Sequence, residues 1–298
     1  MRRLPGTTFR LLGTLGGAFF LILVLLNDAS ANDQRRFGLW IEAEGAKTAF
    51  DSPSDVREVL QFTEGQGLTD LYCQVYRNGR SWFPSLMADD APYRRALAQG
   101  VDPLRTMIDT AHRRGQRVHA WFNTLRIYHN REAPLLKVIG AEAVQKDSYG
   151  NSLLTYNGSG IGPGAMGEGY QLDTPGLWLD PASPEVRRYL VETIRDLVTA
   201  YPDLDGVHLD MVRFPFLMRR KGTSAATIPG GIGYSEASLK RFYEFTGRPV
   251  PPITAKLVRS LEESSAWDTW RRAQVTLLVF EIKELLNSLA PDIEFSAA

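Results

Sequence analysis

Apolar and polar residues follow two periodicities that alternate along this chain. Short segments that are apolar, or apolar at every second position, predict β-strands, because successive side chains of a strand point to opposite faces. Five such segments occur, at 37–43, 71–76, 118–123, 205–210 and 293–296. The segments between them carry apolar residues every three or four positions, which predicts helices with one buried face. The pattern therefore predicts strands and helices in alternation, in the order β-α-β-α-β-α-β-α-β.

Capping residues mark where several of these helices begin. Asp102 and Ser183 are each followed by a proline, the favoured order of an N-cap and a first helical residue. We expect Ser54 to cap the first helix in the same way. Two further helices are expected near 235–245 and over 267–289, where Pro291 follows the apolar stripe.

Alternating strands and helices predict a parallel sheet covered by helices, and so an α/β fold of the (β/α)8 TIM-barrel type. Two long excursions, 78–101 and 124–177, use chain length without supplying barrel strands. The barrel domain, 32–298, is thus expected to be C-terminally incomplete, truncated after about five strands, with an exposed strand edge and a tendency to aggregate. The alternative is that 146–157, with its turn at 149–151, supplies extra strands; we favour a hairpin that decorates a loop.

The N-terminal segment differs from the rest. Three arginines precede an apolar run from Leu11 to Leu26, and Ala29-Ser30-Ala31 follows it. This order predicts a signal peptide over residues 1–31, cleaved before Asn32. We therefore expect a secreted or periplasmic protein, located in the cell envelope or beyond it, with no stable membrane association after cleavage. The alternative is an uncleaved membrane anchor formed by residues 11–26.

Composition narrows the functional classes. The chain has 298 residues, of which 44% are hydrophobic and 23% charged, as in an ordinary globular domain. Without residues 1–31 it carries 31 basic and 33 acidic side chains, a net charge of −2 (31 − 33), and no basic run, so no nucleic-acid partner is expected. The single cysteine, Cys73, is expected in the core. No histidine spacing suits a metal, and the glycine-rich segment 158–164 follows no strand and opens no helix, so no cofactor is expected.

Ionisable residues gather at the end of the fourth predicted strand. His208 and Asp210 share one face there, while Val207 and Leu209 share the other, and Arg213 follows. Barrel enzymes place their catalytic groups at the carboxyl ends of the strands. The alternative is a buried Asp210–Arg213 ion pair that only closes the strand.

These pieces resemble, in order and spacing, the glycosyl-hydrolase-like family 10, a group of secreted (β/α) barrels. The matching segments are GLWI at 38–41, DPL at 102–104, AHRRG at 111–115, VHAWFN at 118–123 with Arg126, WLDP at 178–181, PEVR at 184–187, DGVHLD at 205–210, RFP at 213–215 and WRR at 270–272. The resemblance implies a glycoside-hydrolase-like barrel that acts on a polysaccharide or cell-envelope glycan. Two departures are that many members carry a second aspartate where this chain has Met211, and that the family domain continues past residue 298.

Hydrolysis of a glycosidic bond usually needs two carboxyl groups, a general acid and a nucleophile or base. Asp210 is our candidate for the second role. Glu42, at the end of the first strand, and Asp180 are candidates for the acid, and a residue on a later strand is an equal alternative. Arg213 and His208, together with Asn123, would hold the charge of Asp210 and orient sugar hydroxyls.

The other candidates for substrate binding are Trp121, Arg126, Tyr76 and Arg77. Aromatic rings suit stacking on sugar faces, and the aromatic residues expected beside the mouth of the barrel are Trp82, Phe83, Trp121 and Tyr128. Trp40 is expected to pack beneath the rim. Two other classes remain open: a non-catalytic glycan-binding barrel, with one carboxylate among aromatic rings, and an amidohydrolase or aldolase. The latter needs metal-binding histidines or a strand-end lysine, neither of which occurs.

Overall fold

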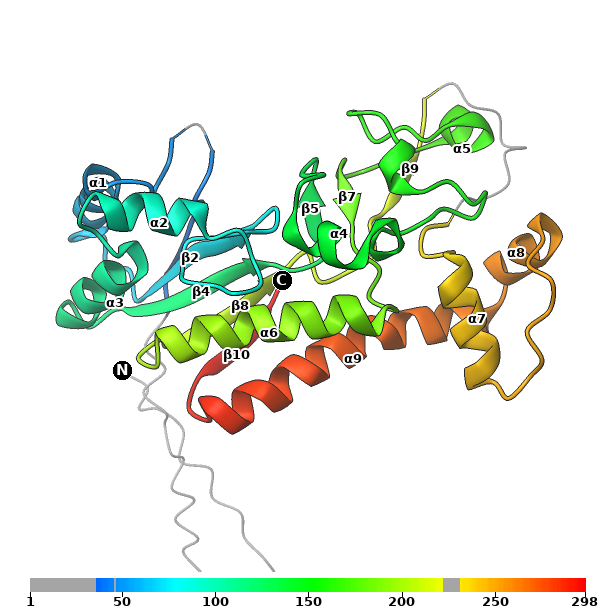
Figure 1. Cartoon of the computed structure of the whole chain (residues 1–298). Coiled ribbons are helices and arrows are strands. Elements are labelled where there is room, and N and C mark those ends of the chain that lie inside the picture. Colours follow the sequence, from blue (N-terminus) through cyan, green and yellow to red (C-terminus); the bar gives the residue numbers. More distant parts are fainter. Residues whose placement is uncertain (1–35, 46, 222–230) are drawn as a thin grey trace, which may run out of the picture. The chain divides into compact units, whose positions relative to one another are not determined.

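Five parallel strands form the centre of the computed structural model, which describes residues 36–45, 47–221 and 231–298 (Figure 1). In sheet order they are β1 (Gly38–Ile41), β2 (Asp70–Arg77), β4 (Arg117–Asn123), β8 (Gly206–Asp210) and β10 (Glu294–Ala297). The short strand β3 (Arg80–Ser81) pairs antiparallel with β2. The five predicted strands are therefore confirmed, and each joins its neighbours in parallel.

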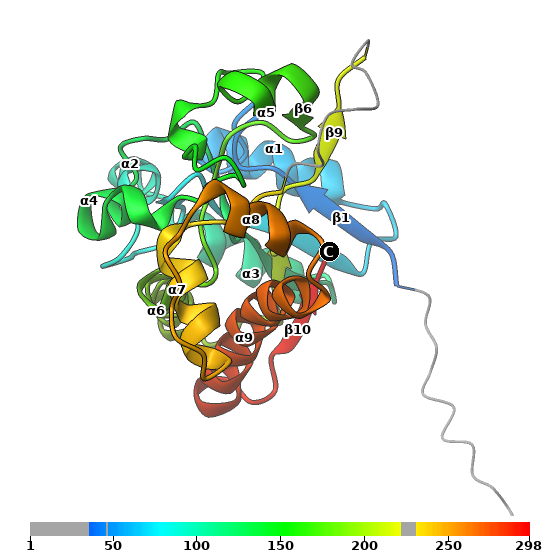
Figure 2. The same cartoon turned by 90° about the vertical axis from the view of Figure 1, so that its right-hand side faces the viewer.

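Helices lie along the chain between these strands, and some of them pack against the sheet. They are α1 (Pro53–Thr63), α2 (Ala91–Ala98), α3 (Pro103–Arg113), α4 (Pro134–Ile139), α5 (Gly164–Gly169), α6 (Pro184–Ala200), α7 (Glu236–Phe245), α8 (Ala255–Glu262) and α9 (Ser265–Leu289). Single 3-10 turns occur at Ala141–Ala143 and Leu153–Thr155. The long helices α6 and α9 run side by side below the sheet in Figure 1, and Figure 2 shows the same pair close to end-on.

Side chains cap several helices where the sequence predicts it. The Asp102 carboxylate accepts a hydrogen bond from the Arg105 amide at 3.0 Å, and the Ser183 hydroxyl accepts one from the Val186 amide at 3.3 Å. Each such cap stabilises a helix by about 1 kcal/mol. The prediction for α1 is wrong by two residues: Ser52 is the cap, because Pro53 fills the first helical position, which needs no N–H donor.

The core lies between the sheet and its helices. Alternate strand residues face these helices and are at most 1% exposed: Leu71, Cys73, Val75, Val118, Ala120, Phe122, Val207 and Leu209. Burial of each large apolar side chain stabilises the fold by about 2 kcal/mol. Burial also raises the pKa of Cys73 to about 12, so its thiol stays protonated at neutral pH. The expectation that Cys73 packs in the core is confirmed.

The two excursions add small structures of their own but no parallel strand to the sheet, since β3 of the first excursion pairs antiparallel with β2. The second contains β5 (Arg126–Tyr128) and β6 (Tyr170–Leu172), which pair antiparallel with β7 (Leu177–Trp178) and β9 (Leu217–Arg219) respectively. Within it, Lys146 and Ser152 bridge across a tight turn, so this stretch decorates a loop, as predicted. The glycine-rich segment does open a short helix, α5, which corrects the expectation that it opens none.

A second, smaller apolar cluster lies beside the sheet core. Its buried residues come mostly from α7, α8 and the start of α9, and they are Ala182, Tyr234, Leu239, Phe242, Val258, Leu261, Trp267 and Trp270. The rings of Trp267 and Trp270 stack with centroids 5.2 Å apart. This cluster attaches the helical region around α7 to the loop between β7 and α6, because Ala182 belongs to that loop.

A network of charges closes the N-terminal end of the sheet. Asp70, 1% exposed, accepts hydrogen bonds from Arg36 at 2.6 Å and from the His119 ring at 2.8 Å, and forms an ion pair with Arg117 at 3.0 Å. Both arginines also bind Glu294 on β10. The ring of His119 fits because Gly206 faces it: a Cβ there would lie 2.0 Å from His119 Nδ1.

This network shows how strongly the sheet curves. Arg36 precedes β1 and Glu294 lies on β10, at opposite edges of the sheet, yet their side chains are 3.0 Å apart. In a flat sheet, four spacings of about 4.8 Å would separate these edges by about 19 Å. The strands therefore curve around a common axis, as they do in the wall of a barrel.

The predicted signal peptide, residues 1–31, lies outside the described residues. Among the helices that the structure describes, none combines the length and the apolar character needed to cross a bilayer.

Candidate functional site

Polar side chains meet at the carboxyl ends of four neighbouring strands. Asp210 ends β8, Asn123 ends β4, Arg77 ends β2, and Glu42 directly follows β1. Asn123 lies opposite Asp210 in the register of the two strands. Because the strands are parallel, these side chains share one edge of the sheet, which we call the mouth. Parallel α/β proteins build their active sites at this edge.

The carboxylate of Asp210 is held at both of its oxygens. Oδ2 accepts a hydrogen bond from the indole Nε1 of Trp121 at 3.0 Å, and Oδ1 accepts one from the Met211 amide at 2.7 Å. Met211 has a φ of +53°, a left-handed conformation that is costly for a side chain of this size. This turn brings the Met211 amide onto the carboxylate, and Asp210 stays partly exposed.

A chain of polar contacts runs across the mouth from Glu42 towards Asp210. The Arg77 guanidinium lies 3.5 Å from the Glu42 carboxylate and donates to the side-chain carbonyl of Gln74 at 3.0 Å. The Gln74 amide in turn donates to Asn123 at 3.5 Å. Gln74 is 1% exposed, within the otherwise apolar stretch 71–76 of β2, and was not predicted as a site residue. A single amide within an apolar strand segment is the sequence signal that could have identified it, because a buried amide needs a polar partner.

Arg126 borders the mouth from β5. Its guanidinium donates two hydrogen bonds to the Pro175 carbonyl, at 3.2 and 2.6 Å, and lies over the Tyr128 ring at 4.8 Å. Burial lowers the pKa of Arg126, while the nearby carboxylates of Asp173 and Asp210 oppose that shift. The guanidinium is thus a partly buried positive charge within electrostatic range of Asp210.

Arg213 forms an ion pair with a different acid from Asp210, the partner considered from the sequence. Its guanidinium forms an ion pair with Asp173 at 3.6 Å and lies between the rings of Trp178 and Phe216, at 5.1 and 4.3 Å. The alternative of an Asp210–Arg213 ion pair is therefore wrong among the described residues. Asp173 lies in the loop after β6, where no periodic pattern marks it, and it was not predicted from the sequence.

His208 lies two residues before Asp210, on the same face of β8. Its Nδ1 is 2.9 Å from the Ser296 hydroxyl, and its ring meets the edges of Trp40 and Tyr72. Burial lowers the pKa of His208, although the charge of Asp210 opposes this, so the ring is neutral at neutral pH. Its Nε2 has no partner among the described residues.

Two of the predicted site residues lie in the interior. Tyr76 is fully buried and stacks on Phe122, with centroids 4.0 Å apart, because a bulge after Gln74 turns it into the core. Asp180 is 1% exposed, and its oxygens accept hydrogen bonds from Ser235, from Ser238 and from the Ala182 amide. It therefore fastens α7 to the loop before α6, and it shares no partner with Asp210 among the described residues.

Several aromatic residues differ from the prediction in their exposure to solvent. Trp82 and Phe83 are at most 1% exposed, so the expectation that they border the mouth is wrong. Tyr128 is 45% exposed beside Arg126, as expected of a rim residue. Trp40 is 51% exposed and stacks on Tyr72 at 4.4 Å, so it is not packed beneath a rim.

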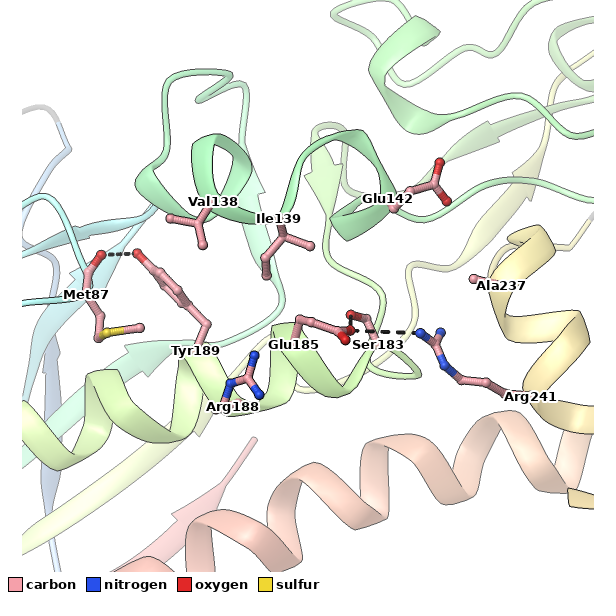
Figure 3. A pocket seen from close by; sticks show the side chains of 10 residues that line it. All are labelled: Met87, Val138, Ile139, Glu142, Ser183, Glu185, Arg188, Tyr189, Ala237 and Arg241. Carbon is pink, nitrogen blue, oxygen red and sulfur yellow. Dashed lines mark hydrogen bonds and ion pairs between the residues drawn. The ribbon is translucent and has the colours of Figure 1, made fainter. Parts of the chain in front are cut away.

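A cavity of about 400 Å³ lies elsewhere, at the start of α6 (Figure 3). The residues that line it come mainly from α4, α6 and α7, and none of them belongs to the mouth. Figure 3 shows Glu185 between its partners Ser183 and Arg241, at 2.8 and 3.9 Å. The charged side chains that line this cavity thus include both acids and bases. The left-handed backbone of Met211 and the carboxylate of Asp210, held at both oxygens, lie instead at the mouth. Over the described ranges, no three His, Cys, Asp or Glu side chains gather as a metal site would require.

A curved parallel sheet, outer helices and a strand-end carboxylate define a protein of the (β/α)-barrel class. The chain belongs to the glycosyl hydrolase-like 10 family, whose pattern it matches over residues 36–298. This confirms the family resemblance noted in the sequence.

Curated relatives carry the same kind of name. The chain is 29% identical over 242 residues to the glycosyl hydrolase DigH of Escherichia coli O6:H1, and 23% identical over 246 residues to the glycosyl hydrolase YngK of Bacillus subtilis. Each match covers 80% of this chain but only 46% and 38% of the relative. The chain thus spans less than half the length of these curated relatives.

Among solved structures, the glycoside hydrolase domain of PgaB (BpsB) from Bordetella bronchiseptica is similar in fold. Its TM-score is 0.54 at 14% sequence identity, and the match covers 88% of this chain and 64% of that one. At this identity the likeness concerns the fold alone. Together with the parallel sheet, it confirms the prediction of a TIM-barrel-type α/β fold.

Proposed function

We propose that this chain is a glycoside hydrolase-like enzyme that acts on a polysaccharide or cell-envelope glycan, with Asp210 as nucleophile or base. The observation that carries the proposal is the carboxylate of Asp210, held at both oxygens by Trp121 and Met211 at the mouth. Membership of a glycosyl hydrolase-like family and the names of the relatives support the same class of reaction.

The proposed chemistry follows from the charges at the mouth. An ionised Asp210 would stabilise the positive charge that develops on the sugar ring, either by forming a covalent intermediate or by activating a water molecule. In this proposal Asn123, Arg126 and Arg213 would donate hydrogen bonds to sugar hydroxyls. The exposed ring of Tyr128 offers a surface on which a sugar face can stack.

Glu42 is the proposed general acid. Its side chain is 57% exposed at the mouth, and its one charged partner, among the described residues, is Arg77 at 3.5 Å. The other candidate, Asp180, is buried with all its oxygens engaged, so the proposal does not use it.

One observation favours the alternative, a non-catalytic glycan-binding barrel. Glu42 and Asp210 are separated by β2 and β4, which amounts to about 14 Å, or three strand spacings, along a flat sheet. Paired carboxyl groups of glycosidases lie about 5–9.5 Å apart, so the curvature of the sheet must bring the two together. If it does not, Asp210 is a single carboxylate among aromatic and basic side chains.

The decisive experiment measures turnover and melting temperature on the same preparation of Asp210→Asn. The substitution preserves shape and removes the charge, so kcat should fall about 10³-fold, equivalent to about 4 kcal/mol, with little change in melting temperature. Asp180→Asn is the matched control and should lower stability without lowering kcat. Wild-type turnover in Asp210→Asn would overturn the assignment, and a wild-type chain that binds glycans without cleaving them would establish the alternative.

We also propose that the protein is exported. The arginines, the apolar run of 11–26 and Ala29-Ser30-Ala31 support cleavage before Asn32 and a secreted or periplasmic location. Sequencing the N-terminus of the exported protein tests this: a start near Asn32 is expected, whereas an intact Met1 in the membrane fraction would indicate an anchor.

A further inference from the structure

The specific contact that Trp121 makes at the mouth is through its indole N–H and not through a ring face. It lies on β4 opposite His208, two residue pairs before the pair of Asn123 and Asp210. Its side chain therefore leans along the sheet to bring Nε1 within 3.0 Å of Asp210 Oδ2. An indole has a single donor, so this contact uses the whole hydrogen-bonding capacity of the Trp121 side chain.

We propose that Trp121 is a positioning residue for Asp210 rather than a platform on which sugar stacks. The indole N–H on Oδ2 and the Met211 amide on Oδ1 act from two sides, so the carboxylate cannot rotate without losing a hydrogen bond. A carboxylate has about four lone-pair sites, so two remain for a substrate or a water molecule. This inference deepens the proposed function and rests on it for its consequence in turnover.

The backbone explains why two donors are needed. The left-handed turn at Met211 supplies one donor, the Met211 amide on Oδ1, and that donor alone leaves Oδ2 without a partner. Trp121 comes from the neighbouring strand, where it is anchored by the ladder between β4 and β8. A donor fixed on a rigid strand holds the carboxylate before the substrate arrives, which is the arrangement that favours catalysis.

The first test compares Trp121→Phe with Trp82→Phe. Phenylalanine keeps an aromatic face but removes the N–H. Trp82 is the matched control because its indole also donates to an aspartate, Asp51, at 2.8 Å, in a buried place outside the mouth. For Trp121→Phe we expect kcat to fall about tenfold or more while KM stays within about twofold. For Trp82→Phe we expect a lower melting temperature with unchanged kcat.

Two outcomes would overturn the inference. If Trp121→Phe keeps both kcat and KM, while Trp121→Ala raises KM, the ring stacks on sugar and its N–H is dispensable. If Trp121→Phe lowers the melting temperature and reduces activity only in proportion to the unfolded fraction, the residue is structural.

A second measurement does not depend on turnover. The chain has six tryptophans, so ¹⁵N labelling gives six indole signals, each assigned by its Trp→Phe variant. Asp210→Asn should shift the Trp121 indole signal more than any other, and Asp51→Asn should shift that of Trp82. An unmoved Trp121 signal would refute the hydrogen bond. If no glycan is hydrolysed by the wild type, the proposed function fails, yet this shift still decides whether Trp121 holds Asp210.

Discussion

The two ends of the parallel sheet use charge in opposite ways. At the N-terminal end, the buried carboxylate of Asp70 is surrounded by Arg36, Arg117 and His119 at 2.6 to 3.0 Å. At the mouth, the carboxylate of Asp210 has neutral donors, and the nearest basic groups act from a distance. A fully paired carboxylate contributes to stability, whereas one held by neutral donors keeps its charge available to a substrate.

Backbone strain also occurs at the carboxyl ends of strands. The non-glycine residues with positive φ, among those described, are Asn78, Tyr128 and Met211, with values of 57°, 49° and 53°. Each lies at or directly after the carboxyl end of a strand. Tyr128 keeps its conformation against Gly176, where a Cβ would lie 2.8 Å from the Tyr128 Cα. Strain of this kind persists where function requires it, and here it is confined to one end of strands.

Beyond the Asp210→Asn variant, the largest effect on this comparison is expected from Asp70→Asn. Removing the charge of this buried carboxylate costs about 3 kcal/mol, because the partly exposed Arg36 and Arg117 and the buried His119 lose their common anionic partner. We expect a lower free energy of unfolding with unchanged kcat, measured by urea denaturation and steady-state assays. Glu64→Gln, which removes an exposed ion pair with Arg114, is the control and should change stability by less than about 0.5 kcal/mol.

The difference in stability between the wild type and Asp70→Asn should depend on pH. Burial alone would raise the pKa of Asp70, but hydrogen bonds from Arg36, Thr69 and His119 outweigh it and hold the pKa well below its usual range. The wild type therefore gains stability from Asp70 above about pH 4, where an unfolded aspartate is ionised, and loses it as pH falls further. Asp70→Asn should lack this loss, and equal stability gaps at pH 7 and pH 2 would contradict the network.

An intermediate effect is expected from Glu42→Gln at the mouth. If Glu42 protonates the leaving oxygen, kcat on a natural glycan should fall about 10²-fold, or about 2.7 kcal/mol, and melting temperature should hardly change. Activity on an aryl glycoside with an acidic leaving group should be largely retained, because that group needs no proton. Equal losses on both substrates would assign Glu42 to binding and leave its ion pair with Arg77 as its role.

The smallest effect is expected from Asp180→Asn. We expect a loss of about 1–2 kcal/mol in unfolding free energy, since three donors lose a charged acceptor. Burial raises the pKa of Asp180, so its native form binds a proton more readily than the unfolded chain. Wild-type stability relative to the variant should then decline as pH rises from about 4 towards neutrality, the opposite sign to Asp70. Denaturation at pH 5 and pH 7 measures this difference.

Local sequence patterns predicted the central strands and the main helices of the fold well. The alternation of 118–123 and the cap-and-proline pair at Asp102 are properties of a few consecutive residues, and both appear as predicted. The pairings of β5 with β7 and of β6 with β9 were not predicted, because each joins strands of two or three residues that are about 50 positions apart. Such short segments carry no periodicity of their own.

The candidate site was predicted only in part, because local patterns mark some of its residues and not others. Asp210 and Asn123 end strands with a clear pattern, so their common edge followed from parallel pairing. The partners of Asp180, by contrast, come from α7, more than 50 residues away, and no local pattern shows that a serine pair will enclose a carboxylate. A bulge in β2 likewise turned Tyr76 inward, which strict alternation does not foresee.

The contact between Arg36 and Glu294 also links the edges of the sheet in local unfolding. The two residues are 258 positions apart, and both depend on Asp70 and Arg117. When β10 detaches, Arg36 loses one of its two acids, and when β1 detaches, Glu294 loses one of its two bases. The opening of either edge thereby weakens the other, so β1 and β10 should behave as one cooperative unit. Their backbone amides would then exchange with solvent at a common free energy, although β2, β4 and β8 lie between them.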